Sequence, residues 1–545
     1  MPPYPEKSLS DWQLRPLAAA LIAAGMLAPA DGHAATLTVV TLAETSISLC
    51  TLRDAVHSVN AQADQGACTA DLGGGRYGSN DAIVFAPALS GTITFATSDP
   101  LALSGPSALS VQSPVLLVGP GSGLMLLTCG STTYRLLEIA STPPVAVSGL
   151  TIAGCVSGGD GPGVLVTDRF NGNVAPIVQL TDVVVRNNSM VNSAGIGGGI
   201  AVVVVNVGAT VTVTDSSISD NVSSGNGGGI GIRGGTAAAT VAVTDSTLNQ
   251  NTGRAGGGAA IQGGASIQLT RSTLAGNVST TDGGGILVQG GVATVRDTTV
   301  FGNQASGRGG GVALVFAPSA FMAINSTLSN NRVSGVGGGI SARGTGPGAI
   351  TLRSATLAAN LASRGAGIMV ENAVASALLT PANVVAINTI VAGNGAGPSV
   401  FDVDSLQPDS WDVSFSVIGN VAPGVTLTGA GNITGAAVPP PFGAGGWLGP
   451  LQDNGGPTFT HELLTSVADP AVNAGDSAFS GLSFDQRGKP FTRVREGRID
   501  IGAFESGPLP VTVPVPAPAD WTLAALSAAL LGLAGLLRRR RRERR

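Results

Sequence analysis

The chain has 545 residues, of which 80 are glycine, 43% are hydrophobic and only 11% are charged. Its formal charge of −5 and its apolar content exclude an intrinsically disordered chain, which needs a high net charge and few apolar residues. Interior glycines disfavour long helices, and glycines that occur in clumps rather than at every third position exclude collagen. A β-rich chain with many tight turns remains.

Residues 1–34 are predicted to be a secretory signal peptide. Two basic residues precede an apolar run over 16–28, and the small residues Gly32 and Ala34 occupy the positions that a signal peptidase recognises. A buried N-terminal helix is the alternative. Without this segment and the last eight residues, 19 basic and 29 acidic side chains remain, a net charge of −10. Such an acidic body argues against nucleic acid as a partner.

The four cysteines are predicted to form disulfides, because an exported chain meets an oxidising compartment. Four cysteines allow three connectivities, and the sequence does not choose among them, although proximity favours pairing each cysteine with its neighbour. A metal site is the weaker alternative, since no CxxC pair is present. The cysteines are Cys50, Cys68, Cys129 and Cys155.

Residues 35–144 are predicted to form an N-terminal cap with the first coils of a repeat fold. The run Cys50-Thr51-Leu52-Arg53-Asp54-Ala55-Val56 has the character of a short helix, and strand-like segments follow at 81–85 and 91–95. This pattern resembles the CSLREA domain, which opens many bacterial surface β-helix proteins. We expect Arg53 and Asp54 to cap the helix or pair locally rather than to act in catalysis.

The segment 145–445 repeats itself. Triple glycines begin at positions 197, 227, 256, 283, 309 and 337, at intervals of 26–30 residues. Such a period is typical of solenoids and propellers, and the units are too short and too poor in Trp and Tyr for propeller blades. We therefore predict an all-β, single-stranded parallel β-helix of nine or ten coils in this segment, with capped ends. The residues expected to stack in its bore are Ile200, Ile230, Ile286, Val312 and Ile340.

A second unit of alternating residues ends in asparagine in each repeat, as in Val213–Asn221 and Val243–Asn251. Glycine and asparagine tolerate the positive φ of a sharp turn, and stacked asparagine side chains can hydrogen-bond from coil to coil. We predict an asparagine ladder, formed by Asn221, Asn251, Asn277, Asn303, Asn331 and Asn360.

Four carboxylates fall within eleven residues near the end of the repeats, without a basic neighbour. Calcium takes six to eight oxygen ligands, and this loop could supply several of them. An acidic surface loop is the favoured interpretation and a calcium site the alternative; no other cofactor is expected. The four residues are Asp402, Asp404, Asp409 and Asp412.

Residues 446–507 carry several motifs in order, among them the run 448–458, then 469–475, Asp485-Gln486-Arg487-Gly488, and 500–505. These motifs resemble the choice-of-anchor Q domain, whose anchoring signal varies from protein to protein. Together with the N-terminal resemblance they imply a secreted or surface-displayed, right-handed β-helix, a pectate-lyase-like solenoid.

The C-terminal end has three parts. A Pro-rich linker over 508–520 precedes the segment 521–545, in which 17 uncharged residues from Trp521 to Leu537 are followed directly by an arginine cluster. This length is near the lower limit for a membrane span, and the basic cluster predicts its cytoplasmic side. The tail resembles the IPTL/PEP-CTERM sorting signals of bacteria, which implies an exosortase-like processing enzyme as a partner and a transient inner-membrane tether. The residues that carry this resemblance are Pro514, Pro516, Trp521 and Arg538.

No catalytic residue is predicted. The mature chain has two histidines, His57 and His461, for which we expect structural roles. One repeat position is filled by Asp215, Asp245, Arg271, Asp297 and Asn325, and such variety is typical of a solvent-facing turn.

We therefore expect an adhesin or matrix protein on the envelope of a Gram-negative bacterium. Its partner is expected to be polysaccharide or another cell surface, held by weak repeated contacts. The alternative is a polysaccharide lyase or hydrolase that acts in a groove of the same helix, a chemistry that needs carboxylates and an arginine to converge.

Overall fold

The computed structural model describes residues 35–507, except 74–75, 131–132, 142–143, 171–173, 346–348, 372–383, 396–399, 466–468, 480 and 496. The predicted signal peptide and the predicted tail with Pro514, Pro516, Trp521 and Arg538 lie outside these residues. In the part of the chain that is described, no helix is long and apolar enough to cross a membrane.

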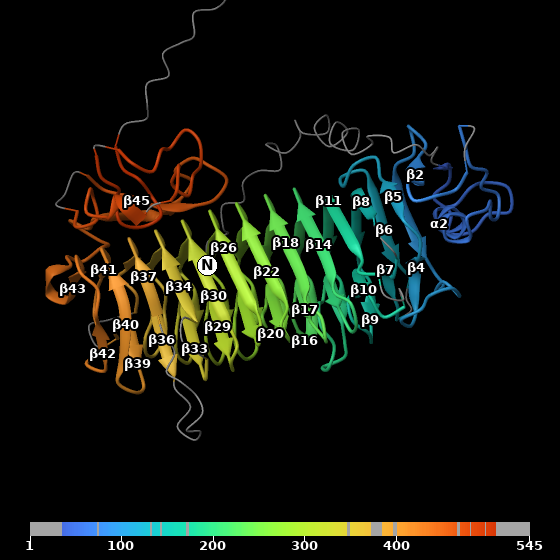
Figure 1. The fold of residues 1–545 in the computed structure, drawn as a ribbon. Coiled ribbons are helices and arrows are strands. Elements are labelled where there is room, and N and C mark those ends of the chain that lie inside the picture. Colours follow the sequence, from blue (N-terminus) through green and yellow to red (C-terminus); the bar gives the residue numbers. More distant parts are fainter. Residues whose placement is uncertain are drawn as a thin grey trace, which may run out of the picture. The chain divides into compact units, whose positions relative to one another are not determined.

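Three parallel sheets, here named A, B and C, run along the stack of coils (Figure 1). Sheet A contains β1 (Thr36–Val39), β2 (Ala82–Phe85), β3 (Gly91–Phe95), β5 (Val115–Val118), β6 (Met125–Cys129), β8 (Val145–Ala153), β11 (Ile177–Arg186), β14 (Ala209–Thr214), β15 (Ser217–Ser219), β18 (Ala239–Thr244), β19 (Thr247–Asn249), β22 (Ser266–Thr270), β23 (Thr273–Ala275), β26 (Val292–Arg296), β27 (Thr299–Phe301), β30 (Ala320–Ile324), β31 (Thr327–Ser329), β34 (Ile350–Arg353), β35 (Thr356–Ala358), β37 (Val384–Ile387), β38 (Ile390–Val391), β40 (Asp409–Ser414), β41 (Val417–Ile418), β42 (Val425–Leu427) and β43 (Ile433–Thr434). Sheet B contains β4 (Ser107–Val111), β7 (Arg135–Ile139), β10 (Val164–Thr167), β13 (Ile200–Val203), β17 (Ile230–Arg233), β21 (Ala259–Gln262), β25 (Ile286–Gln289), β29 (Val312–Val315), β33 (Ile340–Arg343), β36 (Ile368–Glu371) and β39 (Val403–Ser405). Sheet C contains β9 (Val156–Ser157), β12 (Ser189–Met190), β16 (Val222–Asn226), β20 (Thr252–Ala255), β24 (Val278–Ser279), β28 (Gln304–Ala305) and β32 (Arg332–Val333).

Each coil passes through the sheets in turn, and each strand pairs in parallel with its equivalent in the next coil. Sheet B has eleven described strands, of which nine follow Val145 and two precede it. The fold is therefore the predicted right-handed parallel β-helix, and its coils extend into the N-terminal region.

Apolar residues at equivalent positions fill the bore. Ile200 is in register with Ile230, and Ile286 with Val312, and all four are buried. Since successive parallel strands lie about 4.8 Å apart, these side chains form continuous columns that remove apolar surface from water.

The triple glycines have two separate causes. The first residue of each triplet has positive φ, as at Gly227 (74°), where glycine adopts the left-handed conformation without strain. The second lies against the next coil: a Cβ on Gly228 would stand 2.3 Å from the carbonyl oxygen of Gly257. Sequence analysis anticipated the turn but not this close approach between coils.

The asparagines form one continuous buried ladder. In each rung the Nδ2 group donates to Oδ1 of the next asparagine and to a backbone carbonyl of the preceding coil, as Asn251 does to Asn277 and Ile218. The ladder is longer than the predicted six rungs, because Asn188 precedes it and Asn394 follows. Its eight rungs among the described residues are Asn188, Asn221, Asn251, Asn277, Asn303, Asn331, Asn360 and Asn394.

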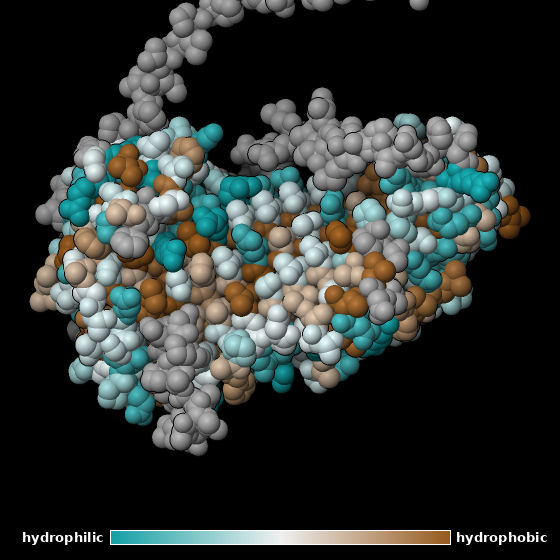
Figure 2. Space-filling view, viewed as in Figure 1, coloured by the Kyte–Doolittle hydropathy of each residue, from teal (hydrophilic) through white to brown (hydrophobic). Residues whose placement is uncertain are grey.

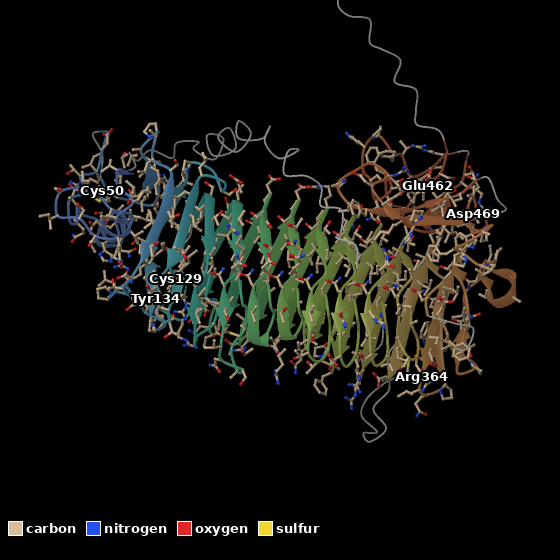
Figure 3. The ribbon with its side chains drawn as sticks, turned by 180° about the vertical axis from the view of Figure 1, so that it is seen from behind. Cys50, Cys129, Tyr134, Arg364, Glu462 and Asp469 are labelled. Atoms are coloured by element: carbon tan, nitrogen blue, oxygen red, sulfur yellow. A yellow bond between two sulfur atoms is a disulfide. The ribbon has the colours of Figure 1, made fainter. Side chains whose placement is uncertain are left out.

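The N-terminal region covers the first coils with helix α2 (Leu52–Ala61). Thr51 caps this helix by accepting a hydrogen bond from the Asp54 amide at 3.1 Å, and Arg53 pairs with Glu44 at 2.8 Å. A disulfide joins Cys50 to Cys68 (Figure 3). These contacts are local, in keeping with a structural role for the helix.

The second disulfide joins Cys129, at the end of β6, to Cys155, immediately after β8. The structure thus contains the pairing of neighbouring cysteines that proximity favours, and its described residues include no free cysteine.

The C-terminal region contains the 3₁₀ helices η2 (Gly435–Ala437) and η3 (Ser477–Phe479) and one antiparallel pair, β44 (Leu448–Gln452) and β45 (Thr460–Leu463). It packs on the outer face of sheet A through hydrogen bonds to outward side chains. Gln486 bonds both Thr299 (2.8 Å) and Thr327 (2.6 Å). The motif resembling choice-of-anchor Q thus joins this region to the coils.

Candidate functional site

The strands of sheet B have an unusual outer face, because sheet C lies against part of it. Ile196, which comes before β13, packs on Ala201, and Ala255 of β20 packs on Ala260 and Leu287. The outward residues of sheet B under this contact are therefore buried, and many are small, such as Ala201 and Ala260. Two rows of residues, several of them polar, border the contact.

The first row lies at the end of each strand of sheet B, where the register aligns Val203, Arg233, Gln262, Gln289, Val315, Arg343 and Glu371. The second row lies just before the triple glycines, where backbone bonds place in succession Ile196, Asn226, Ala255, Asp282, Arg308, Val336 and Arg364. Both rows follow the stacking direction of the coils.

A groove of about 510 Å³ opens between the two rows. It is lined by residues 193–195, Asn226, Arg233, Arg254, Gln262, Gly263 and Gln289, which come from four successive coils. The strands β16, β17 and β20, which carry three of these residues, lie next to one another in Figure 1. The groove therefore crosses several coils rather than lying within one.

The lining of the groove is polar and positively charged. Its two charged side chains are guanidinium groups, and the described residues place no carboxylate in ion-pair contact with either. Arg233 donates to the carbonyl of Ala194 at 3.1 Å, while Arg254 is exposed to solvent. Nε2 of Gln262 donates to Oε1 of Gln289 at 2.8 Å, so these amides form a short ladder along the floor.

Asn226 is the buried member of the groove. Its side chain is 9% exposed, and its Oδ1 atom is buried without a hydrogen-bond partner. An unpaired buried acceptor costs about 1–3 kcal/mol, so a rotation of the Asn226 side chain that turns Oδ1 to a ligand donor in the groove would be favoured.

Charged side chains of opposite sign meet on the coils that follow the groove. Arg308 contacts Glu371 at 2.7 Å and approaches Asp282 at 3.9 Å. Burial raises the pKa of Asp282, and the charge of Arg308 opposes that rise. Farther along, Arg364 makes two hydrogen bonds to Asp404, at 2.9 and 3.1 Å. Figure 3 shows Arg364 at the edge of the coil stack, away from Asp469 of the C-terminal region.

The proposed calcium loop is not assembled in the structure. Asp402 accepts three hydrogen bonds from Asn394 and Asn420 and so terminates the asparagine ladder. Asp404 binds Arg364, Asp409 accepts from the Trp411 indole at 2.8 Å, and Asp412 is exposed.

Three of these carboxylates, Asp402, Asp404 and Asp409, therefore each bind a different partner. Among the described residues, no three His, Cys, Asp or Glu side chains are placed to hold a metal ion. Calcium binding by Asp402, Asp404, Asp409 and Asp412 stays a prediction.

The two histidines of the predicted mature chain both have hydrogen-bond partners. His461 lies between Ser329 and the carbonyl of Gly449, at 2.8 Å from each, and burial lowers its pKa to about 4. His57 is 3.0 Å from Asp99.

The repeat position with varied residues is a left-handed turn in every coil: φ is 50° at Asp215 and Asp245, 47° at Arg271 and 52° at Asp297 and Asn325. Arg271 pairs with Asp245 at 2.7 Å. The row is not solvent-facing throughout, because Asn325 is buried and donates to the Phe484 carbonyl of the C-terminal region.

The residues of the groove were not predicted from the sequence. A signal was available, since Arg233, Gln262 and Gln289 each lie six residues after the first glycine of a triplet, and Asn226 lies one residue before. Aligning the repeats on the glycines brings these positions into two columns. Their proximity depends on the contact between sheets C and B, which no local pattern predicts.

Figure 2 shows hydrophobic and hydrophilic residues interspersed over the face of the coils in view.

No family model and no curated protein matches the chain. Among solved structures it is similar to a pectate lyase, at 13% identity and a TM-score of 0.43, over 87% of this chain and 98% of that one. It is also similar to a PL6 family alginate lyase, at 12% identity and a TM-score of 0.39, over 83% of this chain and 60% of that one. A third similarity is to the A-module of a mannuronan C-5 epimerase from Azotobacter vinelandii, at 11% identity and a TM-score of 0.26, over 66% of this chain and 90% of that one. At identities this low the likeness concerns the fold alone.

Proposed function

We propose that the protein is an exported β-helix that binds polysaccharide in the groove between sheets B and C, without chemically changing it. The observation that carries this proposal is the lining: amides, guanidinium groups and backbone from four successive coils face one open groove. Glycans are recognised through hydroxyl groups, which donate to and accept from such side chains. An open groove that crosses coils admits a polymer in the middle of its chain.

The groove fits a protein that binds polysaccharide without catalysing a reaction, because its described lining contains neither a carboxylate nor a histidine. General acid–base catalysis needs a side chain of that kind within hydrogen-bond reach of the reacting atom. The lining also contains no aromatic ring. Affinity therefore depends on polar contacts, which favours the weak, repeated binding of an adhesin or matrix protein.

Export to the envelope of a Gram-negative bacterium belongs to the same proposal and is supported by the sequence of residues 1–34 and 521–545. An exosortase-like enzyme is the partner that this tail suggests. Fractionating the producing cell, with and without Trp521→Ala, tests it: retention in the inner membrane is expected for a chain that is not processed.

A groove-filling variant tests the binding site. Ala194 is exposed at the groove, so Ala194→Trp should fold and should reduce retention on immobilised polysaccharides. Ala238→Trp is the matched control, because Ala238 is also exposed but does not line the groove. Equal retention of both variants on every polysaccharide that binds the native protein would place the binding surface elsewhere.

A polysaccharide lyase or hydrolase is the second candidate, and one observation favours it. Asp282, whose pKa burial raises, lies beside Arg308 next to the groove, so a carboxyl group and a guanidinium group adjoin the ligand path. The purified protein would then release unsaturated or reducing sugars, and Asp282→Asn would abolish that release. Intact polymer after prolonged incubation would exclude this candidate.

A further inference from the structure

We propose that the glycan is acidic: a uronate-containing chain lies along the stacking direction of the coils, with its carboxylates on Arg233 and Arg254. This inference rests on the proposed glycan-binding function and names the class of polymer that the groove takes.

The groove has a direction that suits a linear polymer. Its lining begins at residues 193–195, continues through Asn226 and Arg254, and ends at Gln289. Because neighbouring parallel strands lie about 4.8 Å apart, the four coils span roughly 15 Å, enough for a short stretch of sugar units in extended form. Each coil presents its own pair of polar positions to the ligand.

The charge of the groove is opposite to that of the body. Residues outside the predicted export segments carry a net charge of −10, yet the charged groups that the described residues bring to the groove are Arg233 and Arg254. Some other arginines of the described coils, such as Arg271, Arg308 and Arg364, pair with a carboxylate. A planar carboxylate from the ligand can accept two parallel hydrogen bonds from a guanidinium group, the pairing that Arg364 makes with Asp404.

The position of Arg233 supports this role. It is half-buried, and its hydrogen bond to the carbonyl of Ala194 at 3.1 Å restrains the guanidinium group at the wall of the groove. Less side-chain entropy is then lost when a ligand binds. Arg254, one coil along, is exposed and can adjust to the next carboxylate.

Asn226 adds a requirement that an inorganic anion does not meet. The buried Oδ1 atom of Asn226 is an acceptor without a partner, so a rotation of this side chain toward a donor in the groove is favoured. A carboxylate or a phosphate ester without hydrogens cannot donate, whereas a sugar hydroxyl can. The groove therefore combines cationic groups for an acid with an acceptor for a hydroxyl, and a uronate unit carries both functions.

The acidic polymer is not expected to bind on the coils past the end of the groove. At the last coil of the groove, Asp282 directly precedes the triplet that leads to Gln289, and together with Glu371 of a later coil it surrounds Arg308. Since these carboxylates already neutralise the guanidinium group, an acidic polymer gains nothing from binding there. The favourable path for the polyanion ends at the last amide of the groove.

Titration calorimetry of the full-length protein tests the inference with three polymers: polygalacturonate, its fully methyl-esterified neutral form, and dextran sulfate. We expect binding of polygalacturonate and roughly tenfold weaker binding of the methyl ester, because each charge-assisted hydrogen bond is worth about a factor of ten or more. Arg233→Gln and Arg254→Gln should each weaken polygalacturonate binding by a similar factor.

Arg332→Gln is the matched control, because Arg332 is an exposed arginine of sheet C that does not line the groove. Equal affinities for polygalacturonate and its methyl ester would overturn the acidic assignment while leaving glycan binding intact. Equal affinities for dextran sulfate and polygalacturonate would reduce the groove to a general anion site and also overturn it. If no glycan of either kind binds, the proposed function itself fails.

Discussion

Replacing Asn303 with alanine removes one rung from the middle of the buried asparagine ladder. The side chain of Asn303 takes part in four hydrogen bonds: it accepts from the amide and from Nδ2 of Asn277, and it donates to Leu274 and Asn331. All four are 2.9–3.1 Å long and buried. The substitution therefore leaves donors and acceptors on the two adjacent coils without partners.

At about 1 kcal/mol of net stabilisation for each bond, Asn303→Ala should lower the free energy of unfolding by about 4 kcal/mol. The matched control is Asn249→Ala. Asn249 lies on β19, two coils before Asn303, and its Oδ1 is buried without a partner, so its removal should change stability by less than about 0.5 kcal/mol. Urea unfolding followed by circular dichroism measures both variants.

A loss below about 1 kcal/mol for Asn303→Ala would refute the reasoning, because it would mean that neighbouring coils replace the missing partners at little cost. Unequal transitions by different probes are expected if coils unfold separately, since each coil contacts only its neighbours. The comparison of the two variants holds in either case.

Gly228→Ala should destabilise the fold by about 3 kcal/mol or more, because the new Cβ would stand 2.3 Å from a carbonyl oxygen. Gly264→Ala should cost only about 1 kcal/mol, because Gly264 has φ of 77° but open space around it. The melting temperatures of the two variants test this ranking. Burial raises the pKa of Glu505 to about 8, so the folded state holds a proton that the unfolded state releases. The free energy of unfolding should therefore fall as the pH rises from about 5 to about 8. Glu505→Gln should flatten this pH dependence in melting experiments. Replacing both Cys129 and Cys155 with serine should lower stability by about 3 kcal/mol, as expected for a loop closed across 26 residues, and a melting temperature equal to that of the native protein would contradict this.

The repeat, the bore and the ladder could be predicted from the sequence because each depends on a local pattern that recurs at a fixed period. Asn221 and Asn251 show this: the same short strand and turn precede both, so their stacking follows once coils are assumed. The end of the ladder could not be predicted in this way. Asp402 occupies the next rung eight residues after Asn394, where the repeat has already lost its period.

The groove could not be predicted from the sequence for a different reason. Arg233 and Arg254 belong to different sheets, and only the packing of sheet C on sheet B brings them to one surface. Closeness in sequence suggested a shared site for the four clustered aspartates, whereas Asp404 faces Arg364 and Asp402 faces the ladder.

Hydrogen–deuterium exchange with and without polygalacturonate tests most directly whether the groove is the binding surface. Slower exchange is predicted for the amides of residues 193–196 and 252–255, which border the groove, with no change in β14 and β18 of sheet A. Protection confined to sheet A, with the groove segments unchanged while the polymer is bound, would contradict the account.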